Sequence, residues 1–425
     1  MKTVVVVGGS LAGIRAAEMI LAKGFPGKCL IISREPEPAY ERPPLSKQVI
    51  TKGWEFDQVS LDVDNLESLE ITRGKSAISL DVASKVVTLS DETKINYDGL
   101  IIATGCEPRL LSLPCYSQGN LPNRSNPSPA LVSISQDLDN VLTLRTFGDA
   151  AKIRSRVAGN SKVVIIGAGF IGLELSSSLS QIGAKVTLID PLDGLLQRTL
   201  GGYFSSYFEG LVRSNGIALQ LGTTPTFFAI DSNRQVTGVA TSSGEIFSCD
   251  LVIVAIGVIP STAWLADSNV LLHPKDHGVV CNKYCQVMSK AGAPIENVFA
   301  CGDVAWWHNE LFDGPMRIEH FENAVSMGRC SGSNLVARPG DLASYTEIPF
   351  FWSDMFGKKI QYVGRSDEDS ELEFIEGNLA SDKFLAIYSN QGRITAAIGV
   401  GRPAKLMKIR TKIGEGASID AIGTN

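Results

Sequence analysis

The hydrophobic residues of this chain form short apolar runs followed by helical patterns, and the same succession occurs twice. Residues 3–7 contain four consecutive valines, which predict a strand buried on both faces. Residues 11–23 place apolar side chains at helical spacing, and residues 29–33 predict the next strand. The order strand, helix, strand returns at residues 163–190. This duplication predicts an α/β protein with two doubly wound, Rossmann-like domains.

Each unit has a glycine-rich turn between its first strand and its helix. The two turns read Gly8-Gly9-Ser10-Leu11-Ala12-Gly13 and Gly167-Ala168-Gly169-Phe170-Ile171-Gly172. Glycines in such a turn let backbone N–H groups approach a pyrophosphate at the helix N-terminus. The second turn is the stronger signal, because Ser10 stands where the middle glycine of the first is expected. Two such turns in one chain predict two nucleotides held face to face.

An acidic residue ends the second strand of each unit, at Glu35 and at Asp190. A carboxylate in this place accepts hydrogen bonds from ribose hydroxyls and repels a 2′-phosphate. Asp190 therefore predicts a preference for NADH over NADPH, and its alternative role is that of a turn residue before Pro191. In the first unit Arg34 stands beside Glu35 and competes for the same position.

Two further segments carry polar side chains suited to a flavin. Residues 40–47 place Arg42 and Lys47 in a turn stiffened by two prolines, where both offer positive charge to a phosphate or a reduced flavin. Residues 298–305 predict a strand that ends at Asp303, with a helix expected to follow. The Asp303 carboxylate is suited to bind ribityl hydroxyls and also to cap that helix.

Composition narrows the function classes. The chain has 425 residues and a net charge of −6, which argues against general affinity for nucleic acid. No run of about 20 apolar residues is present, so we expect no membrane span. The eight cysteines form no C-x-x-C and the four histidines form no metal-ligand spacing, so we expect no metal site. A redox or metal-binding pair at Cys281 and Cys285 is the alternative to incidental thiols in a reducing, cytoplasmic setting.

Taken in order, the motifs resemble the NADH-dependent ferredoxin reductases of bacterial oxygenase systems, which have the FAD-containing pyridine nucleotide-disulfide oxidoreductase fold. The resemblance runs from residue 3 to about residue 410. Besides the two glycine turns, it rests on Arg42-Pro43-Pro44-Leu45-Ser46-Lys47, Ala103-Thr104-Gly105-Cys106-Glu107-Pro108-Arg109, Leu144-Arg145-Thr146, Leu173-Glu174, Gly302-Asp303-Val304-Ala305, Arg317-Ile318-Glu319-His320-Phe321-Glu322-Asn323-Ala324 and Phe351-Trp352-Ser353-Asp354.

The resemblance implies a glutathione-reductase-like architecture. We expect a split FAD domain at residues 1–110 and 268–335, and a NAD domain at residues 141–267. Short strand-like runs after residue 335 predict a C-terminal α+β domain at residues 336–425. Residues 111–140 are rich in proline, serine and asparagine, which predicts a linker or a surface loop.

The resemblance also implies the residues that contact the two cofactors. Contacts to FAD are implied for Gly8, Ser10, Leu11, Ala12, Gly13, Glu35, Arg42, Lys47, Ala77, Arg145, Asp303 and Phe321. Contacts to NAD(H) are implied for Gly167, Gly169, Phe170, Ile171, Gly172, Glu174, Asp190 and Gly257. Further cofactor contacts are implied for Ala103, Thr104, Gly105, Arg109, Val304, Glu319 and His320. Phe321 departs from the family, which often has tryptophan there.

The implied reaction is electron transfer from NADH through FAD to a 2Fe-2S ferredoxin that feeds a mono- or dioxygenase. Hydride transfer needs no general base, so Lys47 is the one catalytic candidate, as a positive charge beside the reduced flavin. A basic segment with Arg402, Lys405, Lys408 and Arg410 is suited to dock an acidic ferredoxin, with a solvated helix face as the alternative. We expect a monomer or weak dimer.

Three alternatives stay open within this fold. They are a rubredoxin reductase, an NADH oxidase, and a redox-sensing flavoprotein resembling apoptosis-inducing factor. A thiol-based oxidoreductase needs a cysteine close to the flavin, and residues 34–60 contain none. The absence of a cysteine there argues against that class.

Overall fold

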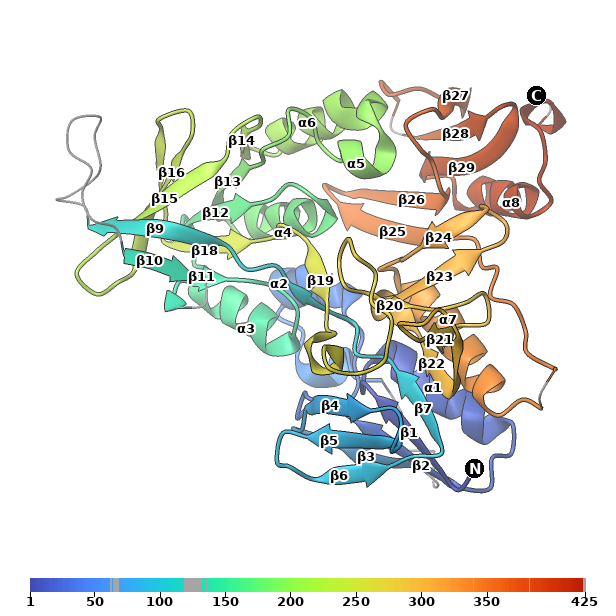
Figure 1. Ribbon diagram of the computed structural model, residues 1–425. Coiled ribbons are helices and arrows are strands. Elements are labelled where there is room, and N and C mark those ends of the chain that lie inside the picture. Colours follow the sequence, from blue (N-terminus) through green and yellow to red (C-terminus); the bar gives the residue numbers. More distant parts are fainter. Residues whose placement is uncertain are drawn as a thin grey trace.

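The structure is a computed structural model that describes residues 1–61, 63, 69–117, 131–134, 137–338, 340–381 and 383–422 (Figure 1). It combines two parallel sheets flanked by helices with a C-terminal antiparallel sheet (Figure 1). No helix of the described residues has the length and hydropathy needed to cross a bilayer.

The first parallel sheet joins strands from two distant parts of the chain. Its order is β21-β22-β7-β1-β2-β3, with β21 antiparallel to β22. Four strands come from the first 102 residues: β1 (Thr3–Val7), β2 (Lys28–Ile32), β3 (Leu69–Thr72) and β7 (Gly99–Ile102). The other two are β21 (Gln286–Met288) and β22 (Pro294–Ala300). Val4, Val5 and Val6 of β1 are fully buried, as the valine run predicted.

Two helices pack closely on this sheet and lie side by side in Figure 1, α1 (Leu11–Ala22) and α7 (Phe321–Leu335). Glycines allow the close approach, because a Cβ on Gly328 would lie 2.4 Å from the Ala12 carbonyl oxygen. A Cβ on Gly332 would lie 2.3 Å from the Ala16 carbonyl oxygen. An antiparallel sheet of β4 (Ala77–Asp81), β5 (Val86–Leu89) and β6 (Lys94–Asn96) follows β3, and the short helix α2 spans Gln48–Lys52.

The second parallel sheet has the order β11-β18-β12-β13-β14. Its strands are β11 (Val141–Leu142), β12 (Lys162–Ile166), β13 (Lys185–Ile189), β14 (Ala218–Gln220) and β18 (Leu251–Val254). The helices of this region are α3 (Phe147–Arg156), α4 (Phe170–Gln181), α5 (Gln197–Leu200) and α6 (Ser205–Ser214). The glycine turn at residues 167–169 leads from β12 into α4, just as the first leads from β1 into α1.

The expectation of a linker or surface loop at residues 111–140 is wrong for most of its described part. β9 (Ser112–Ser117) and β10 (Leu131–Ile134) pair antiparallel and join a sheet with β15 (Pro225–Ile230), β16 (Val236–Thr241) and β17 (Ile246–Ser248). Leu113 and Cys115 are buried against that sheet. Pro114 is tolerated because the pairing of β9 with β15 begins one residue later. Residues 118–130, 135 and 136 lie outside the described residues.

The helix expected directly after Asp303 is also absent. Gly302–Val304 form one 3-10 turn, and β23 (Ala305–Asn309) follows at once. Asp303 therefore caps no helix there, and the sheet of β20 (Val279–Val280), β23 and β24 (Gly314–Met316) occupies the place of that helix. Two short strands, β8 (Cys106–Pro108) and β19 (Val258–Pro260), pair antiparallel.

The C-terminal region has the predicted α+β composition. Its antiparallel sheet has the order β25-β26-β29-β28-β27 and carries one helix, α8 (Pro403–Gly414), on β26 and β29. The strands are β25 (Phe350–Met355), β26 (Lys358–Gly364), β27 (Glu371–Glu376), β28 (Phe384–Asn390) and β29 (Arg393–Val400). β25 contacts α4, so the C-terminal sheet lies directly on the helix of the second glycine turn (Figure 1).

Candidate functional site

Two adjoining cavities open at the two glycine turns. The first is lined by residues of the first turn and by Ala77, Ala103, Thr104 and Gly105. The second is lined by Gly167, Gly169, Phe170, Asp190 and Gly257. The cavities share the side chains of a common wall, namely Pro43, Leu144, Ile171, Glu174, Glu319, His320 and Phe321. Two nucleotides in these cavities would therefore meet at that wall.

Both turns require glycine for the same geometric reason. Gly8 has φ of +125°, and a Cβ there would lie 2.1 Å from the Ala103 carbonyl oxygen. Gly167 has φ of +105°, and its Cβ would lie 2.3 Å from that of Ala255. The last glycine of each turn lets the helix pack against the turn. A Cβ on Gly13 would lie 1.9 Å from the Gly8 carbonyl oxygen, and one on Gly172 would lie 2.0 Å from the Gly167 carbonyl oxygen. Any side chain would push the turn off its sheet.

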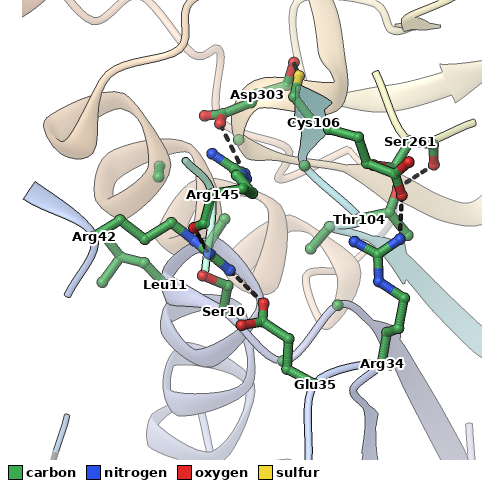
Figure 2. A pocket seen from close by; sticks show the side chains of 18 of the residues that line it. Ser10, Leu11, Arg34, Glu35, Arg42, Thr104, Cys106, Arg145, Ser261 and Asp303 are labelled. Atoms are coloured by element: carbon green, nitrogen blue, oxygen red, sulfur yellow. Dashed lines mark hydrogen bonds and ion pairs between the residues drawn. The ribbon is translucent and has the colours of Figure 1, made fainter. Parts of the chain in front are cut away.

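A chain of charged side chains lines the first cavity, and Figure 2 shows its members pointing toward one another. Arg42 forms an ion pair with Glu35 and donates to the Arg145 carbonyl at 2.5 Å. Arg145 in turn lies 3.5 Å from the Asp303 carboxylate. Burial by itself would raise the pKa of Glu35, but Arg42 and the Tyr40 hydroxyl hold it below its ordinary value. The arrangement keeps the carboxylate charged and fixes both guanidinium groups at the cavity.

Arg34, the sequence competitor of Glu35, turns to another partner. It forms an ion pair with Glu107, and both residues line the first cavity. The two neighbours therefore do not compete for one position, because Arg34 pairs with Glu107 and Glu35 pairs with Arg42.

Asp190 is held by the backbone of two segments and also lines the second cavity. One of its carboxylate oxygens accepts from the Ala168 N–H of the glycine turn at 2.7 Å, and the other accepts from the Leu192 N–H at 2.9 Å. The residue also lines the second cavity. Each carboxylate oxygen has two lone pairs, so capacity is left for a ribose hydroxyl.

Lys47 lies in a buried ion pair. Its Nζ is 2.6 Å from the Glu174 carboxylate, and the two side chains are 12% and 9% exposed. Lys47 lines the second cavity, whereas Glu174 lines both. Ser46 and Ser353 each donate a hydrogen bond of 2.5 Å to the same carboxylate. Reasoning from sequence singled out Lys47 and Glu174 but gave no sign that these serines meet them, since Ser353 lies 179 residues away.

Aromatic side chains surround the shared wall. Phe321, the first residue of α7, meets Trp352 edge to face at 5.8 Å. His320 and Phe170 both contact the Phe351 ring, each with ring centroids 4.8 Å apart. A tryptophan therefore does lie beside this wall, although it comes from β25 and not from the position of Phe321.

Two residues of this wall, Glu319 and His320, have shifted pKa values. Burial raises the pKa of Glu319 and nearby Asp303 adds to it, although Arg317 opposes the change. Burial lowers the pKa of His320 to about 4, so its imidazole is neutral at pH 7. Its Nδ1 has no hydrogen-bond partner among the described residues, and the residue lines both cavities. This nitrogen is available to a ligand.

The His320 pKa predicts a loss of stability in weak acid. Between its ordinary value of 6.5 and about 4, the unfolded chain binds a proton that the folded protein does not. Stability therefore falls as pH falls through this window. We expect His320→Phe to reduce the drop in thermal unfolding midpoint between pH 7 and pH 5 by a few degrees, roughly. His308→Gln, at an exposed histidine, serves as control, and an unchanged drop in His320→Phe would contradict the assignment.

Four implied contact residues lie outside the walls of both cavities. Gly13 and Gly172 support the turns, and Val304 is fully buried. The Arg109 backbone N–H donates to the Gly257 carbonyl at 2.9 Å, so this arginine braces the second cavity through its backbone. Residues that line the cavities without a sequence signal include Ser261, Trp264 and Arg198.

All eight cysteines are free thiols. The described residues contain no disulfide, and burial raises the pKa of Cys281 and of Cys285 above the ordinary value, so both are protonated thiols. No three histidine, cysteine or acidic side chains of the described residues converge as a metal site.

The chain matches the family model described as pyridine nucleotide-disulphide oxidoreductase over residues 2–328. It belongs to that family. Residues 350–423 match a second model, described as reductase C-terminal. Proteins of this family and the related ferredoxin reductases use FAD and NAD(H). The paired cavities fit such a pair of nucleotides, with glycine turns for two pyrophosphates and the His320 nitrogen available at the shared wall.

The relatives are electron-transfer reductases. Rhodocoxin reductase of Rhodococcus erythropolis is 31% identical over 96% of this chain and 88% of its own length. Putidaredoxin reductase of Pseudomonas putida is 29% identical over 95% of this chain and 89% of its own. The structure of a covalent putidaredoxin reductase–putidaredoxin complex superposes with a TM-score of 0.85 at 27% identity, covering 98% of this chain and 93% of the other.

Proposed function

We propose that this chain is a cytoplasmic, FAD-dependent NADH:ferredoxin reductase that supplies a 2Fe-2S ferredoxin of a mono- or dioxygenase system. The observation that carries the proposal is the pair of adjoining cavities with one shared wall. It is supported by relatives named as ferredoxin reductases of benzene and chlorobenzene dioxygenase systems, 27% and 28% identical.

The proposal assigns FAD to the first cavity and NADH to the second. The FAD domain would comprise residues 1–110 and 268–335, and the NAD domain residues 141–267, in agreement with strands that both segments give to the first parallel sheet. FAD, when bound, takes two electrons from NADH and releases them singly. Arg42, Arg145 and Asp303 line the first cavity, where the two arginines would offer positive charge to the FAD phosphates and Asp303 would accept hydrogen bonds from its hydroxyls. Lys47 stabilises negative charge at the junction of the two cavities.

NADH is the proposed donor because Asp190 places a carboxylate in the second cavity. A 2′-phosphate there would meet a like charge, which costs affinity. Arg198 lines the same cavity and is exposed, so it would attract such a phosphate. The other two cations of this cavity, Lys47 and Arg317, already form ion pairs with carboxylates. The carboxylate is the stronger determinant, because two backbone N–H groups fix its position.

Stopped-flow spectroscopy tests this function. The FAD-loaded protein is mixed with NADH or NADPH, and the reduced protein is then mixed with candidate 2Fe-2S ferredoxins. We expect reduction by NADH to be about tenfold or more as efficient as reduction by NADPH, followed by one-electron transfer to a ferredoxin. Equal efficiency with NADPH contradicts the Asp190 assignment. Transfer to oxygen or to rubredoxin alone identifies an NADH oxidase or a rubredoxin reductase, and slow transfer to every acceptor identifies a redox sensor.

The proposed ferredoxin docking at α8 would depend on the positive charges that have no local partner. Arg402 and Lys405 both pair with Glu376, and Arg410 pairs with Glu347, so much of the positive charge is neutralised locally. Lys408 is exposed on the same helix. The rate of electron transfer to the ferredoxin, measured at low and at high ionic strength, tests whether α8 takes part in docking. If unpaired charges such as Lys408 attract the ferredoxin, salt screens them and the rate falls.

A further inference from the structure

Three parts of the chain meet at one buried carboxylate. Glu174 lies on α4 of the second parallel-sheet region, Ser46 ends the 3-10 turn Pro43–Ser46 of the first, and Ser353 lies on β25 of the C-terminal sheet. Counted over the whole residue, backbone included, the exposed fractions of Glu174, Ser46 and Ser353 are 7%, 5% and 1%. A buried carboxylate with this many donors is a fixed part of the structure, not a mobile surface group.

The donors divide between the two oxygens of Glu174. Ser353 donates to Oε1 at 2.5 Å, whereas Ser46 donates to Oε2 at 2.5 Å and the Lys47 ammonium lies 2.6 Å from Oε2. Lys47 and Ser46 thus contact one oxygen, and Ser353 alone of these donors contacts the other. Without the Ser353 hydroxyl the carboxylate could rotate about its last bond, and the Lys47 ammonium would follow its partner.

The C-terminal sheet is itself held firmly against α4. The Phe356 N–H donates to the Ser177 hydroxyl at 2.8 Å, and the Phe351 ring packs edge to face on Phe170 at 4.8 Å. These contacts lie on either side of Ser353 along the chain, so its hydroxyl reaches Glu174 from a rigid strand. A residue on a rigid element positions its partner more accurately than one on a loop.

We propose that Ser353 is a positioning residue through which the C-terminal domain orients the Glu174–Lys47 pair at the junction of the two cavities. The inference rests on the proposed function, because the pair matters for the reaction only when FAD and NADH occupy those cavities. It gives the C-terminal domain a part in the reaction with NADH, separate from any part in ferredoxin docking. Ser353 touches neither reacting atom and acts through Glu174.

A double-mutant cycle on the FAD-loaded full-length protein tests the inference, using Ser353→Ala, Lys47→Met and the combined variant. The rate of flavin reduction by NADH and the midpoint potential of the bound FAD are measured for each. Ser353→Ala should lower the reduction rate about tenfold, since it removes a hydrogen bond to a charged group. In the Lys47→Met background the same change should alter the rate less than about twofold, because no ion pair is left to orient. The midpoint potential of the bound FAD should likewise change in Ser353→Ala and change less when the same substitution is made in the Lys47→Met background.

Matched variants separate positioning from folding. Ser353→Thr keeps the hydroxyl and should recover most of the rate. Ser389→Ala removes a buried serine of β28 in the same sheet and should leave rate and potential unchanged. Thermal unfolding of the FAD-free proteins then reports how much each change loosens the domain.

Three results would overturn the inference. They are an unchanged rate in Ser353→Ala, an equal loss in both backgrounds, or an equal loss in Ser389→Ala. Flavin reduction in Lys47→Met at the parent rate would also overturn it, because the pair would then have no part in the reaction. Failure of the proposed function has a different signature, since NADH would then not reduce the FAD of the parent protein.

Discussion

Replacing Gly167 with alanine is expected to slow reduction of the bound FAD by NADH about a hundredfold, while FAD stays bound. Gly167 has φ of +105°, and an added Cβ would lie 2.3 Å from the Ala255 carbonyl oxygen. The turn must therefore move away from β18, and its N–H groups move with it. A shift of about 1 Å in the bound nucleotide suffices for a loss of this size.

The measurement is stopped-flow reduction together with the visible absorbance of the purified protein. Gly210→Ala is the matched control, because Gly210 lies in α6 of the same region and its Cβ would meet no atom within 4 Å. Gly8→Ala gives the reciprocal result, loss of FAD, since its Cβ would lie 2.1 Å from the Ala103 carbonyl oxygen. Normal reduction of Gly167→Ala by NADH would show that the second turn is not the pyrophosphate site.

Removing the Glu174 carboxylate is expected to cost about 3 kcal/mol of stability, because it leaves the largely buried Lys47 ammonium without its negatively charged partner. Lys47 keeps its hydrogen bond to the Pro43 carbonyl at 3.1 Å, which does not compensate for a lost ion pair. Ser46 and Ser353 lose their acceptor at the same time. For Glu174→Ala we expect the thermal midpoint of the affected transition to fall by roughly 5–10 °C.

Differential scanning calorimetry checks this expectation, because a chain with several domains need not unfold in one step. The double variant Lys47→Met/Glu174→Leu should regain most of the stability, since it replaces both charges with apolar groups of similar size. Glu415→Ala, which breaks an exposed pair with Lys412, should leave the midpoint unchanged. A midpoint for Glu174→Ala equal to that of the parent protein would mean that Lys47 reaches water when its partner is lost.

Much of the fold could be predicted from local sequence. The valine run at residues 4–7 and the two glycine turns predict strands β1 and β12 with their helices, because burial on both faces and close backbone approach leave few other residue choices. The prediction failed where a strand carried turn-forming residues. In β9 we gave Pro114 more weight than the alternating apolar residues Leu113 and Cys115 and therefore expected a loop. The segment is a strand, and its pairing with β15 starts at Cys115, one residue after the proline. After Asp303 the sequence predicted a helix, but the structure has strand β23, which pairs with β24.

The site divides in the same way. Gly8, Gly167 and Asp190 could be predicted to line nucleotide cavities, because their roles depend on neighbours within one βαβ unit. The partners of each charge could not be predicted. Arg34 and Glu35 are adjacent in sequence, but the fold gives Glu107 to one and Arg42 to the other.

The sequence by itself determined that this protein has two strand–helix–strand units with glycine turns, and which glycines those turns require, because those constraints act over short stretches of backbone. Only the tertiary structure decided that Ser46, Lys47 and Ser353 converge on Glu174, and that Trp352 stands beside Phe321. The reason is that a buried carboxylate selects its donors by distance in space, and side chains up to 179 residues apart reach it only after the domains have packed.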